Sequence, residues 1–465
     1  MNPLTCIDFY KADHRRQYPE DTEYVYSNFT ARKSMLGDSK VLFFGLQYFI
    51  KWFLIEEFNK EFFQRPKEEV ISDYREMMEN TIGGLESYTH LEDLHDLGYL
   101  PIRIKALPEG SLVDIKVPLF TITNTSPKYF WIVNYLETIL STTLWKMITS
   151  ATTSYKYRKL LDRYAKETGD ETFTPFQGHD FSFRGMSGVQ DAAMSGAGHL
   201  LSFVGTDTIP AIELLQKYYS GKGLIGCSVP ATEHSVMCMG SKEEEFETFK
   251  RLITEIYPKG IVSIVSDTWD LWKVVEDYLP RLKEEILARE GRIVIRPDSG
   301  DPVQISLEVV RRLAKNFGVQ VNDKGYKRIH ANLGVIYGDS ITLERCEQIL
   351  EGLKKEGYSS DNMVFGIGSY SFQYCTRDTH GFAMKATWGQ IKGDGREIFK
   401  DPVTDNGTKK SARGLLRIEK EGENYILYDQ QTTDNGGELQ TVFEDGKLLV
   451  DVSLDQMRRG LSNEK

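Results

Sequence analysis

Four short apolar runs in the second half of the chain each end at a polar or glycine-rich corner. The runs cover residues 261–265, 293–295, 335–337 and 363–365. Successive positions within each run are apolar, a pattern typical of parallel strands that are buried on both faces. Helical periodicity follows the first three corners, as in the stripe formed by Leu307, Val310, Leu313 and Phe317. The alternation predicts consecutive βα units, and therefore a β/α barrel.

The corners after these runs hold much of the candidate chemistry. They carry Asp267, Arg296, Asp298, Gly338, Asp339 and the motif Gly366-Ile367-Gly368-Ser369. In a β/α barrel such corners meet at one rim and build the active site. Any single corner is explained more readily by ordinary turn and helix-cap chemistry than by a ligand site. Four charged or glycine-rich corners together favour a ligand site, and glycine lets backbone N–H groups approach a phosphate.

Two further segments combine aromatic, charged and small residues. His179-Asp180-Phe181-Ser182-Phe183-Arg184-Gly185 is interpreted either as a ligand-facing strand end or as a strand with Phe181 and Phe183 in one core. His234, in the corner at 230–235, is a candidate acid, base or nucleophile, although a structural histidine explains it too. From the residues alone, the chain is predicted to be a phosphate-handling β/α barrel.

Composition narrows the class of protein. A chain of 465 residues with 40% hydrophobic and 27% charged residues suits a soluble protein with a large barrel and a second region. The net charge of -11 opposes nonspecific binding to nucleic acid or to anionic membranes. The five scattered cysteines fit reduced thiols, and we find neither a secretory leader nor an apolar run long enough for a membrane span. We therefore expect a cytoplasmic location, with no nucleic-acid or membrane partner.

An ordered series of motifs along the chain adds a family resemblance. The strongest are Phe44-Gly45-Leu46-Gln47-Tyr48, His179-Asp180-Phe181, Gly205-Thr206-Asp207-Thr208, Ser228-Val229-Pro230-Ala231, Glu233-His234-Ser235 and Ile295-Arg296-Pro297-Asp298-Ser299-Gly300. From Asp8-Phe9-Tyr10-Lys11 to Thr441-Val442-Phe443, the chain resembles the nicotinamide phosphoribosyltransferase family. The resemblance implies a type II phosphoribosyltransferase fold, an irregular β/α barrel over 151–385 with a second α+β region formed by 1–150 and 386–465.

The same resemblance implies an activity and an assembly. The reaction joins nicotinamide to 5-phosphoribosyl-1-pyrophosphate, giving nicotinamide mononucleotide and pyrophosphate in NAD salvage. Mg²⁺ serves as cofactor, and ATP is a co-substrate whose hydrolysis is coupled through a phosphohistidine. The expected assembly is a homodimer with shared active sites, and no direct metal ligands are assigned.

Residue roles are carried over by matched position. In the family pattern Phe181 and Tyr10 of the partner subunit sandwich the pyridine ring, and Asp207 accepts a hydrogen bond from the carboxamide nitrogen. A carboxylate at Asp207 should repel nicotinate. The other assigned base-binding residues are Arg184, Ser263 and Arg296, and the catalytic residues are His234, Asp267 and Asp298. In that pattern His234 is the residue that is phosphorylated, and Asp267 orients it.

The remaining matched positions bind ribose, phosphate or pyrophosphate. They are Arg32, Gly338, Asp339, Gly368, Ser369, Arg377, Lys385, Lys400 and Lys409. Basic residues and Mg²⁺ at these positions would stabilise the charge of the departing pyrophosphate. A solvated surface position explains Lys400 or Lys409 equally well.

Three alternatives stay open at this point. A nicotinate phosphoribosyltransferase would share the barrel and the sugar donor, and Asp207 is the residue that argues against it. An aldolase or isomerase would need a Schiff-base lysine or a metal cluster at a strand end, and the four corners contain neither. A non-enzymatic binding protein on the same fold is the most remote alternative, because the acidic and aromatic site positions are intact.

Overall fold

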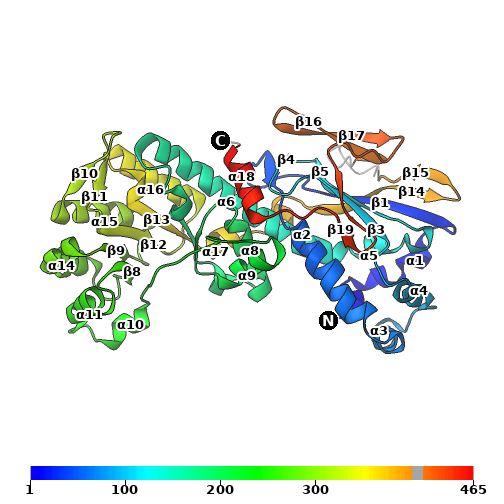
Figure 1. Ribbon diagram of the computed structural model, residues 1–465, viewed down its shortest axis with the longest axis horizontal. Helices are drawn as coiled ribbons and strands as arrows, with labels where there is room; N and C mark the ends of the chain where they lie inside the picture. Colours follow the sequence, from blue (N-terminus) through cyan, green and yellow to red (C-terminus); the bar gives the residue numbers. More distant parts are fainter. Residues whose placement is uncertain (1, 401–411, 464–465) are drawn as a thin grey trace. The chain divides into compact units, whose positions relative to one another are not determined.

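The computed structural model describes residues 2–400 and 412–463, which form two compact units (Figure 1). The first unit comprises Met1–Thr152, Leu215–Gly221 and Thr376–Lys465. The second comprises Thr153–Leu214 and Lys222–Cys375. Two of the boundaries fall within helices, α6 (Glu137–Thr168) and α9 (Ile209–Tyr218). Each unit is built around a hydrophobic core of its own.

The second unit contains a six-stranded sheet in the order β7-β6-β13-β12-β9-β8. All five strand pairs of this sheet are parallel. The strands are β6 (Gly178–Asp180), β7 (Gly205–Thr206), β8 (Gly260–Val265), β9 (Gly291–Arg296), β12 (Leu333–Tyr337) and β13 (Met363–Ile367). A separate antiparallel hairpin is formed by β10 (Val319–Val321) and β11 (Lys327–Ile329). The four apolar runs are therefore confirmed as parallel strands.

One irregular segment closes this sheet into a barrel. Cys227 pairs in parallel with Gly205 of β7, and Ala231 pairs in parallel with Ser263 of β8. The Thr206 amide donates to the Cys227 carbonyl at 3.0 Å, and the Ser263 amide donates to the Pro230 carbonyl at 2.9 Å. Both edge strands of the sheet thus bond to the same short stretch of chain, and the predicted irregular β/α barrel is confirmed.

Helices in the second unit follow the strands, as the periodicity predicted. Their bounds are α7 (Thr174–Gln177), α8 (Val189–His199), α10 (His234–Met239), α11 (Glu245–Arg251), α12 (Leu271–Lys273), α13 (Leu279–Arg281), α14 (Lys283–Ala288), α15 (Pro302–Phe317), α16 (Leu343–Lys355) and α17 (Ser369–Phe372). Shorter 3-10 or π segments are η6 (Phe183–Gly185), η7 (Leu252–Ile256), η8 (Val274–Tyr278) and η9 (Ser360–Asn362). Asp301 caps α15 by accepting from the Gln304 amide at 2.8 Å, and Pro302 occupies the first helical position. The buried stripe Val309, Val310, Leu313 and Phe317 joins the core of this unit.

The first unit contains a seven-stranded sheet in the order β15-β14-β1-β5-β3-β18-β19. Its strands are β1 (Thr22–Thr30), β3 (Ile102–Ala106), β5 (Pro118–Asn124), β14 (Ala383–Ile391), β15 (Asp394–Glu397), β18 (Gln440–Glu444) and β19 (Lys447–Leu448). β1 pairs with both β5 and β14, so the opening of the chain and its last quarter share one antiparallel sheet. The predicted α+β region built from both ends of the sequence is confirmed.

The rest of the first unit packs on this sheet or extends from it. Two small antiparallel pairs are β2 (Lys40–Leu42) with β4 (Leu112–Asp114), and β16 (Leu415–Glu421) with β17 (Asn424–Gln431). The helices are α1 (His14–Gln17), α2 (Leu46–Phe49), α3 (Lys67–Ile82), α4 (Thr89–Leu97), α5 (Ile132–Tyr135) and α18 (Leu454–Asn463). Shorter 3-10 or π segments are η1 (Pro3–Thr5), η2 (Phe9–Asp13), η3 (Ile50–Glu57), η4 (Asn59–Phe63), η5 (Pro127–Tyr129) and η10 (Arg377–Thr379). Within the described ranges of both units, no helix has the length and apolar character that crossing a membrane requires.

Candidate active site

The loops after β8 and β9 bring two carboxylates together. The Asp298 amide donates to Asp267 Oδ2 at 2.9 Å, and the Ser299 hydroxyl donates to the same oxygen. Burial raises the pKa of Asp298, with the negative charges of Asp267 and Asp339 acting in the same direction and Arg296 opposing them. Three carboxylates, those of Asp267, Asp298 and Asp339, thus interact at this end of the barrel, which suits a ligand that becomes positively charged.

Phe181 follows the carboxyl end of β6 and lies next to Gly366 of β13 and Gly338, which follows β12. A Cβ at Gly366 would lie 2.4 Å from Phe181 Cδ2, and one at Gly338 would lie 2.5 Å from Asp298 Oδ1. Because the two glycines have no side chains, the Phe181 ring and the Asp298 carboxylate can occupy this space. Phe183 is 37% exposed, so the alternative in which Phe181 and Phe183 share one core is wrong. Phe181 is instead a half-buried ring at the rim.

Asp207 follows β7 and belongs to the same rim. Its Oδ1 lies 2.9 Å from His179 Nε2 and accepts from the Ser228 hydroxyl at 2.6 Å. Partial burial alone would raise the pKa of Asp207, but the bonds from His179 and Ser228 and the charge of Arg296 lower it. Asp207 is therefore an ionised acceptor, and its Oδ2 takes no part in these two bonds.

Ser263 and Arg296 present buried donors at the same end of the barrel. Arg296 Nη2 donates to the Thr232 carbonyl at 2.8 Å. The hydroxyl of Ser263 and the Nε of Arg296 are buried and have no hydrogen-bond partner among the described residues. Since a buried unsatisfied donor is costly, both atoms are suited to bind a ligand oxygen.

His234 opens α10 and faces the loop after β8. Its Nδ1 lies 3.1 Å from the Thr268 hydroxyl, and its Nε2 lies 4.0 Å from Asp267 Oδ1. The histidine side chain is 48% exposed and the Asp267 side chain 6% exposed. Asp267 Oδ1 is buried without a hydrogen-bond partner in the described part of the chain. The ring thus has one nitrogen bonded by a hydroxyl and the other near a carboxylate that has a free lone pair.

The other predicted residues of the second unit surround this rim. Arg184, in η6, and Asp339, after β12, are exposed. Gly368 precedes α17, and a Cβ at Gly368 would meet nothing closer than 4.0 Å. A Cβ at Gly185 would lie 2.7 Å from Ser369 Cβ, so the loops after β6 and β13 touch each other.

A cationic cluster lies in the first unit. Lys385 is exposed on β14, but partial desolvation lowers its pKa; Glu137 opposes the shift, and the positive charges of Arg32, Lys400 and Arg377 add to it. Arg32 Nε donates to the Gly381 carbonyl at 2.8 Å, next to the turn that carries Arg377. Lys385 and the three cations that act on it suit the binding of a multiply charged anion. We call Arg32, Arg377, Lys385 and Lys400 the cationic cluster.

Two predicted residues remain, Tyr10 and Lys409. Tyr10 is 58% exposed in η2, where its ring packs against His14 at a centroid distance of 5.1 Å. Lys409 lies outside the described residues.

Sequence reasoning assigned no role to several residues that hold the site in place. Thr268, Ser299 and Thr232 bond His234, Asp267 and Arg296 respectively. His179 and Ser228 stood within recognised motifs, but the motifs gave no sign that both side chains bond Asp207. Over the part of the chain that the structure describes, no three His, Cys, Asp or Glu side chains converge as a metal site.

Comparison with known proteins decides the family. A model of the nicotinamide phosphoribosyltransferase N-terminal domain matches residues 2–104, and a model of the nicotinate phosphoribosyltransferase family matches residues 176–447. A curated relative from Acinetobacter baylyi, named nicotinamide phosphoribosyltransferase, is 54% identical over 100% of this chain and 98% of its own. The chain belongs to the nicotinamide phosphoribosyltransferase family. It is therefore a phosphoribosyltransferase enzyme.

Solved structures of other proteins have folds similar to that of this nicotinamide phosphoribosyltransferase family member. A nicotinate-nucleotide pyrophosphorylase from Pyrococcus furiosus matches with a TM-score of 0.63 at 14% identity, covering 100% of this chain and 95% of its own. Human nicotinic acid phosphoribosyltransferase matches with a TM-score of 0.58 at 16% identity, covering 98% and 93%. At such identities the similarity establishes the type II phosphoribosyltransferase fold alone.

Proposed function

We propose that this enzyme transfers the 5-phosphoribosyl group of 5-phosphoribosyl-1-pyrophosphate to nicotinamide, giving nicotinamide mononucleotide and pyrophosphate in NAD salvage. The observation that supports nicotinamide over nicotinate is the ionised Asp207 beside the Phe181 rim. The name of the Acinetobacter relative supports the same assignment.

Base recognition follows from the donors and acceptors at the barrel rim. The pyridine ring stacks on Phe181, and its carboxamide N–H donates to Asp207 Oδ2. The carboxamide oxygen accepts from the buried Ser263 hydroxyl and Arg296 Nε, which have no partner among the described residues. Nicotinate would replace the donor by a second negative charge next to Asp207.

The reaction exchanges one bond at the anomeric carbon of the sugar for another. The pyridine nitrogen forms a bond to the anomeric carbon as the carbon–oxygen bond to pyrophosphate breaks, and the electron pair leaves with pyrophosphate. Positive charge that develops on the ribose is stabilised by the carboxylates of Asp298, Asp267 and Asp339, which interact electrostatically with one another. We assign the binding of phosphate groups to the cationic cluster of the first unit, and we assign the same role to Arg184, Gly338, Gly368 and Ser369 of the second unit.

Mg²⁺ is proposed as the counter-ion of the donor pyrophosphate. The donor set fits this role, because Mg²⁺ is commonly bound through substrate phosphates, water and one or two carboxylates. Asp298 and Asp339 are carboxylates of this kind, and the described residues contain no all-protein metal cage. When bound, the ion would lower the charge on the leaving pyrophosphate.

ATP coupling is proposed through His234. An imidazole nitrogen would attack the γ-phosphorus of ATP, forming a nitrogen–phosphorus bond as the bond to ADP breaks. Thr268 at one ring nitrogen and Asp267 near the other support this role, because such partners fix the tautomer and orient the ring. The homodimer with Tyr10 of the partner subunit in the base clamp, and the cytoplasmic location, also remain proposals.

Steady-state product formation tests the activity directly. Purified enzyme is supplied with 5-phosphoribosyl-1-pyrophosphate, Mg²⁺ and either nicotinamide or nicotinate, each with and without ATP. We expect nicotinamide mononucleotide to dominate and ATP to raise its yield. The match to the nicotinate family model favours nicotinate as the second candidate substrate. Preferential formation of nicotinate mononucleotide would establish that candidate, and no product from either base would refute both.

Replacement of Lys385 by methionine should weaken donor binding. Loss of one charge-assisted phosphate contact is worth about 1.5–3 kcal/mol, so KM for 5-phosphoribosyl-1-pyrophosphate should rise roughly tenfold to a hundredfold. The lowered pKa of Lys385 makes its amine lose a proton at lower pH than an ordinary lysine does. In wild type KM should therefore begin to rise on the alkaline side, and this inflection should disappear in Lys385→Met.

Lys392 supplies a matched control for this variant. It is an exposed lysine just beyond β14 that forms an ion pair with Asp21 at 2.9 Å. No residue of the cationic cluster takes part in this ion pair. Lys392→Met should leave the donor KM unchanged. Equal effects of the two substitutions would contradict a specific role for Lys385.

A further inference from the structure

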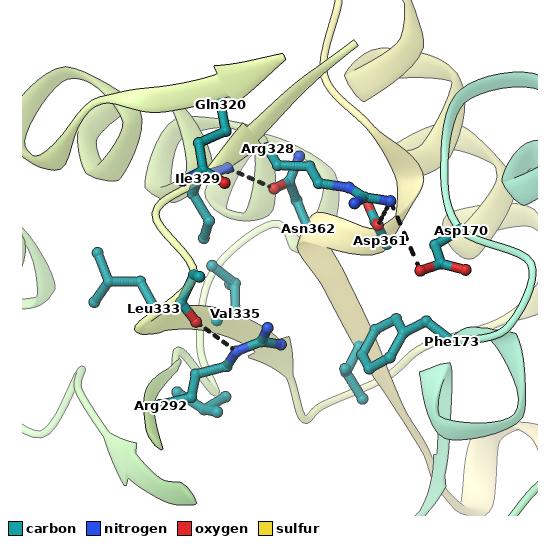
Figure 2. Close-up of a pocket in the computed structure, with 14 residues that line it drawn as sticks. Asp170, Phe173, Arg292, Gln320, Arg328, Ile329, Leu333, Val335, Asp361 and Asn362 are labelled. Carbon is teal, nitrogen blue, oxygen red and sulfur yellow. Dashed lines mark hydrogen bonds and ion pairs between the residues drawn. The ribbon is translucent and has the colours of Figure 1, made fainter. Parts of the chain in front are cut away.

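A cavity lies in the second unit at the amino ends of the parallel strands (Figure 2). It has a volume of about 230 Å³ and is lined by residues of β9, β12 and β13 together with the β11 segment. Arg292 lies four positions before Arg296 on β9, which at about 3.3 Å per residue separates the two by about 13 Å. The cavity is therefore distinct from the rim that carries Asp207 and Phe181.

Arg292 is the charged group of this cavity that is left without an ionic partner. Among described residues, its hydrogen bond joins Nε to the Ala331 carbonyl at 3.0 Å, and no carboxylate lies within ion-pair distance. In Figure 2 the end of the guanidinium extends into the cavity. Burial lowers the pKa of Arg292 and the charge of Arg328 adds to this shift, while Asp361 opposes it without forming an ion pair, so the charged form of Arg292 is destabilised on balance. An anion bound to the two terminal nitrogens would remove that cost.

The opposite wall of the cavity carries a cation that is already neutralised. Arg328 Nη2 lies 2.5 Å from Asp361 Oδ2 and 4.0 Å from Asp170 Oδ2, as the dashed lines of Figure 2 show. These two arginines and two aspartates cancel in formal charge. The cavity therefore has no net positive charge that would attract anions from a distance. Recognition depends on short contacts with Arg292 itself.

The remaining walls are mostly apolar and suit an apolar body. Phe173, Val294, Val335 and Val364 line the cavity. Gly334 lets Arg292 lie across β12, because a Cβ there would lie 3.0 Å from Arg292 Cδ. A ligand of matching chemistry has one anionic group for the guanidinium and a small, apolar remainder.

We propose that this cavity is a binding site for a small apolar monocarboxylate, held by the terminal nitrogens of Arg292 in a bidentate contact. A carboxylate matches the planar fork of the guanidinium, and the volume admits a single ring. The inference does not depend on the phosphoribosyl transfer proposed above, since it concerns a separate cavity and a direct binding measurement.

Binding of 4-fluorobenzoate to the full chain, followed by fluorine NMR, tests this site. Arg292→Gln is the informative variant, because its side-chain amide nitrogen can keep the bond to the Ala331 carbonyl while the terminal charge is lost. We expect saturable binding to wild type, at least tenfold weaker binding to Arg292→Gln, and intermediate affinity for Arg292→Lys. The neutral isostere 4-fluorobenzamide should bind wild type at least tenfold more weakly than the carboxylate.

Two control variants separate this site from the rest of the molecule. Arg251→Leu removes an exposed arginine of α11 outside the cavity, and Phe181→Ala disrupts the base rim. Both should bind 4-fluorobenzoate as wild type does. Affinity that falls in Phe181→Ala but persists in Arg292→Gln would place the ligand at the rim and overturn the proposal. Absence of saturable binding to wild type up to about 10 mM would overturn it as well.

Discussion

Replacing Asp207 by asparagine should reduce the preference for nicotinamide over nicotinate by about two orders of magnitude. The substitution removes the charge that repels the carboxylate of nicotinate, and it replaces an acceptor by an amide that can donate. Together these changes are worth roughly 2–3 kcal/mol in relative transition-state stability. The measurement is the ratio of kcat/KM for the two bases, in wild type and in Asp207→Asn, at fixed donor and ATP concentrations.

Ser228→Ala is the matched control for Asp207→Asn. It removes the hydroxyl that donates to Asp207 Oδ1 at 2.6 Å but leaves the carboxylate and its contact with His179. The preference should survive in this variant, with at most a modest loss. An unchanged ratio in Asp207→Asn would show that selectivity comes from elsewhere in the pocket.

The pH dependence of selectivity gives a second readout of Asp207. Its lowered pKa means that the carboxylate stays ionised at neutral and mildly acidic pH. Selectivity that depends on this charge should be present above that lowered pKa and should be lost only as pH falls through it. Asp207→Asn should lack this acid limb.

The barrel strands were predictable from the sequence because burial on both faces leaves a local mark. The run at 261–265 became β8 (Gly260–Val265), and the run at 335–337 lies within β12 (Leu333–Tyr337). Turn and cap residues such as Gly300 and Asp301 mark the corners as well, which placed Asp267 and Asp298 at one rim. These features depend on residues near one another in sequence, so a periodic pattern reveals them.

Features that depend on distant pairs were beyond the sequence pattern. The barrel is closed by residues 227–231, a stretch without strand periodicity, through pairings to Gly205 and Ser263. The bond between His179 and Asp207 spans two strands, and the fully buried Asp180 sits between residues that line the rim. The exposure of Phe183 likewise follows from the tight turn after β6. The apolar residue type alone predicts burial and so gives no indication of this exposure. Long-range pairing and local exposure had to come from the structure.

His234→Ala should abolish the ATP stimulation of product formation while leaving slower, ATP-independent synthesis. Alanine removes the ring nitrogen that would take the γ-phosphoryl group, but it leaves the base rim and the Asp298 carboxylate in place. Loss of the nucleophile should eliminate acid-labile, base-stable labelling of the protein by γ-labelled ATP. The measurements are product yield with and without ATP, and protein labelling on the same samples.

Thr268→Val makes this prediction sharper, because it keeps the histidine and removes only the hydroxyl 3.1 Å from its Nδ1. If the hydroxyl merely orients the ring, labelling should persist at a reduced rate, and the donor KM without ATP should match wild type. His234→Ala should then differ in kind from Thr268→Val, with no labelling at any ATP concentration. Full ATP stimulation in His234→Ala would refute the phosphohistidine. The exposed His234 beside the buried Asp267, whose Oδ1 has no hydrogen-bond partner among the described residues, would then have no role in ATP coupling.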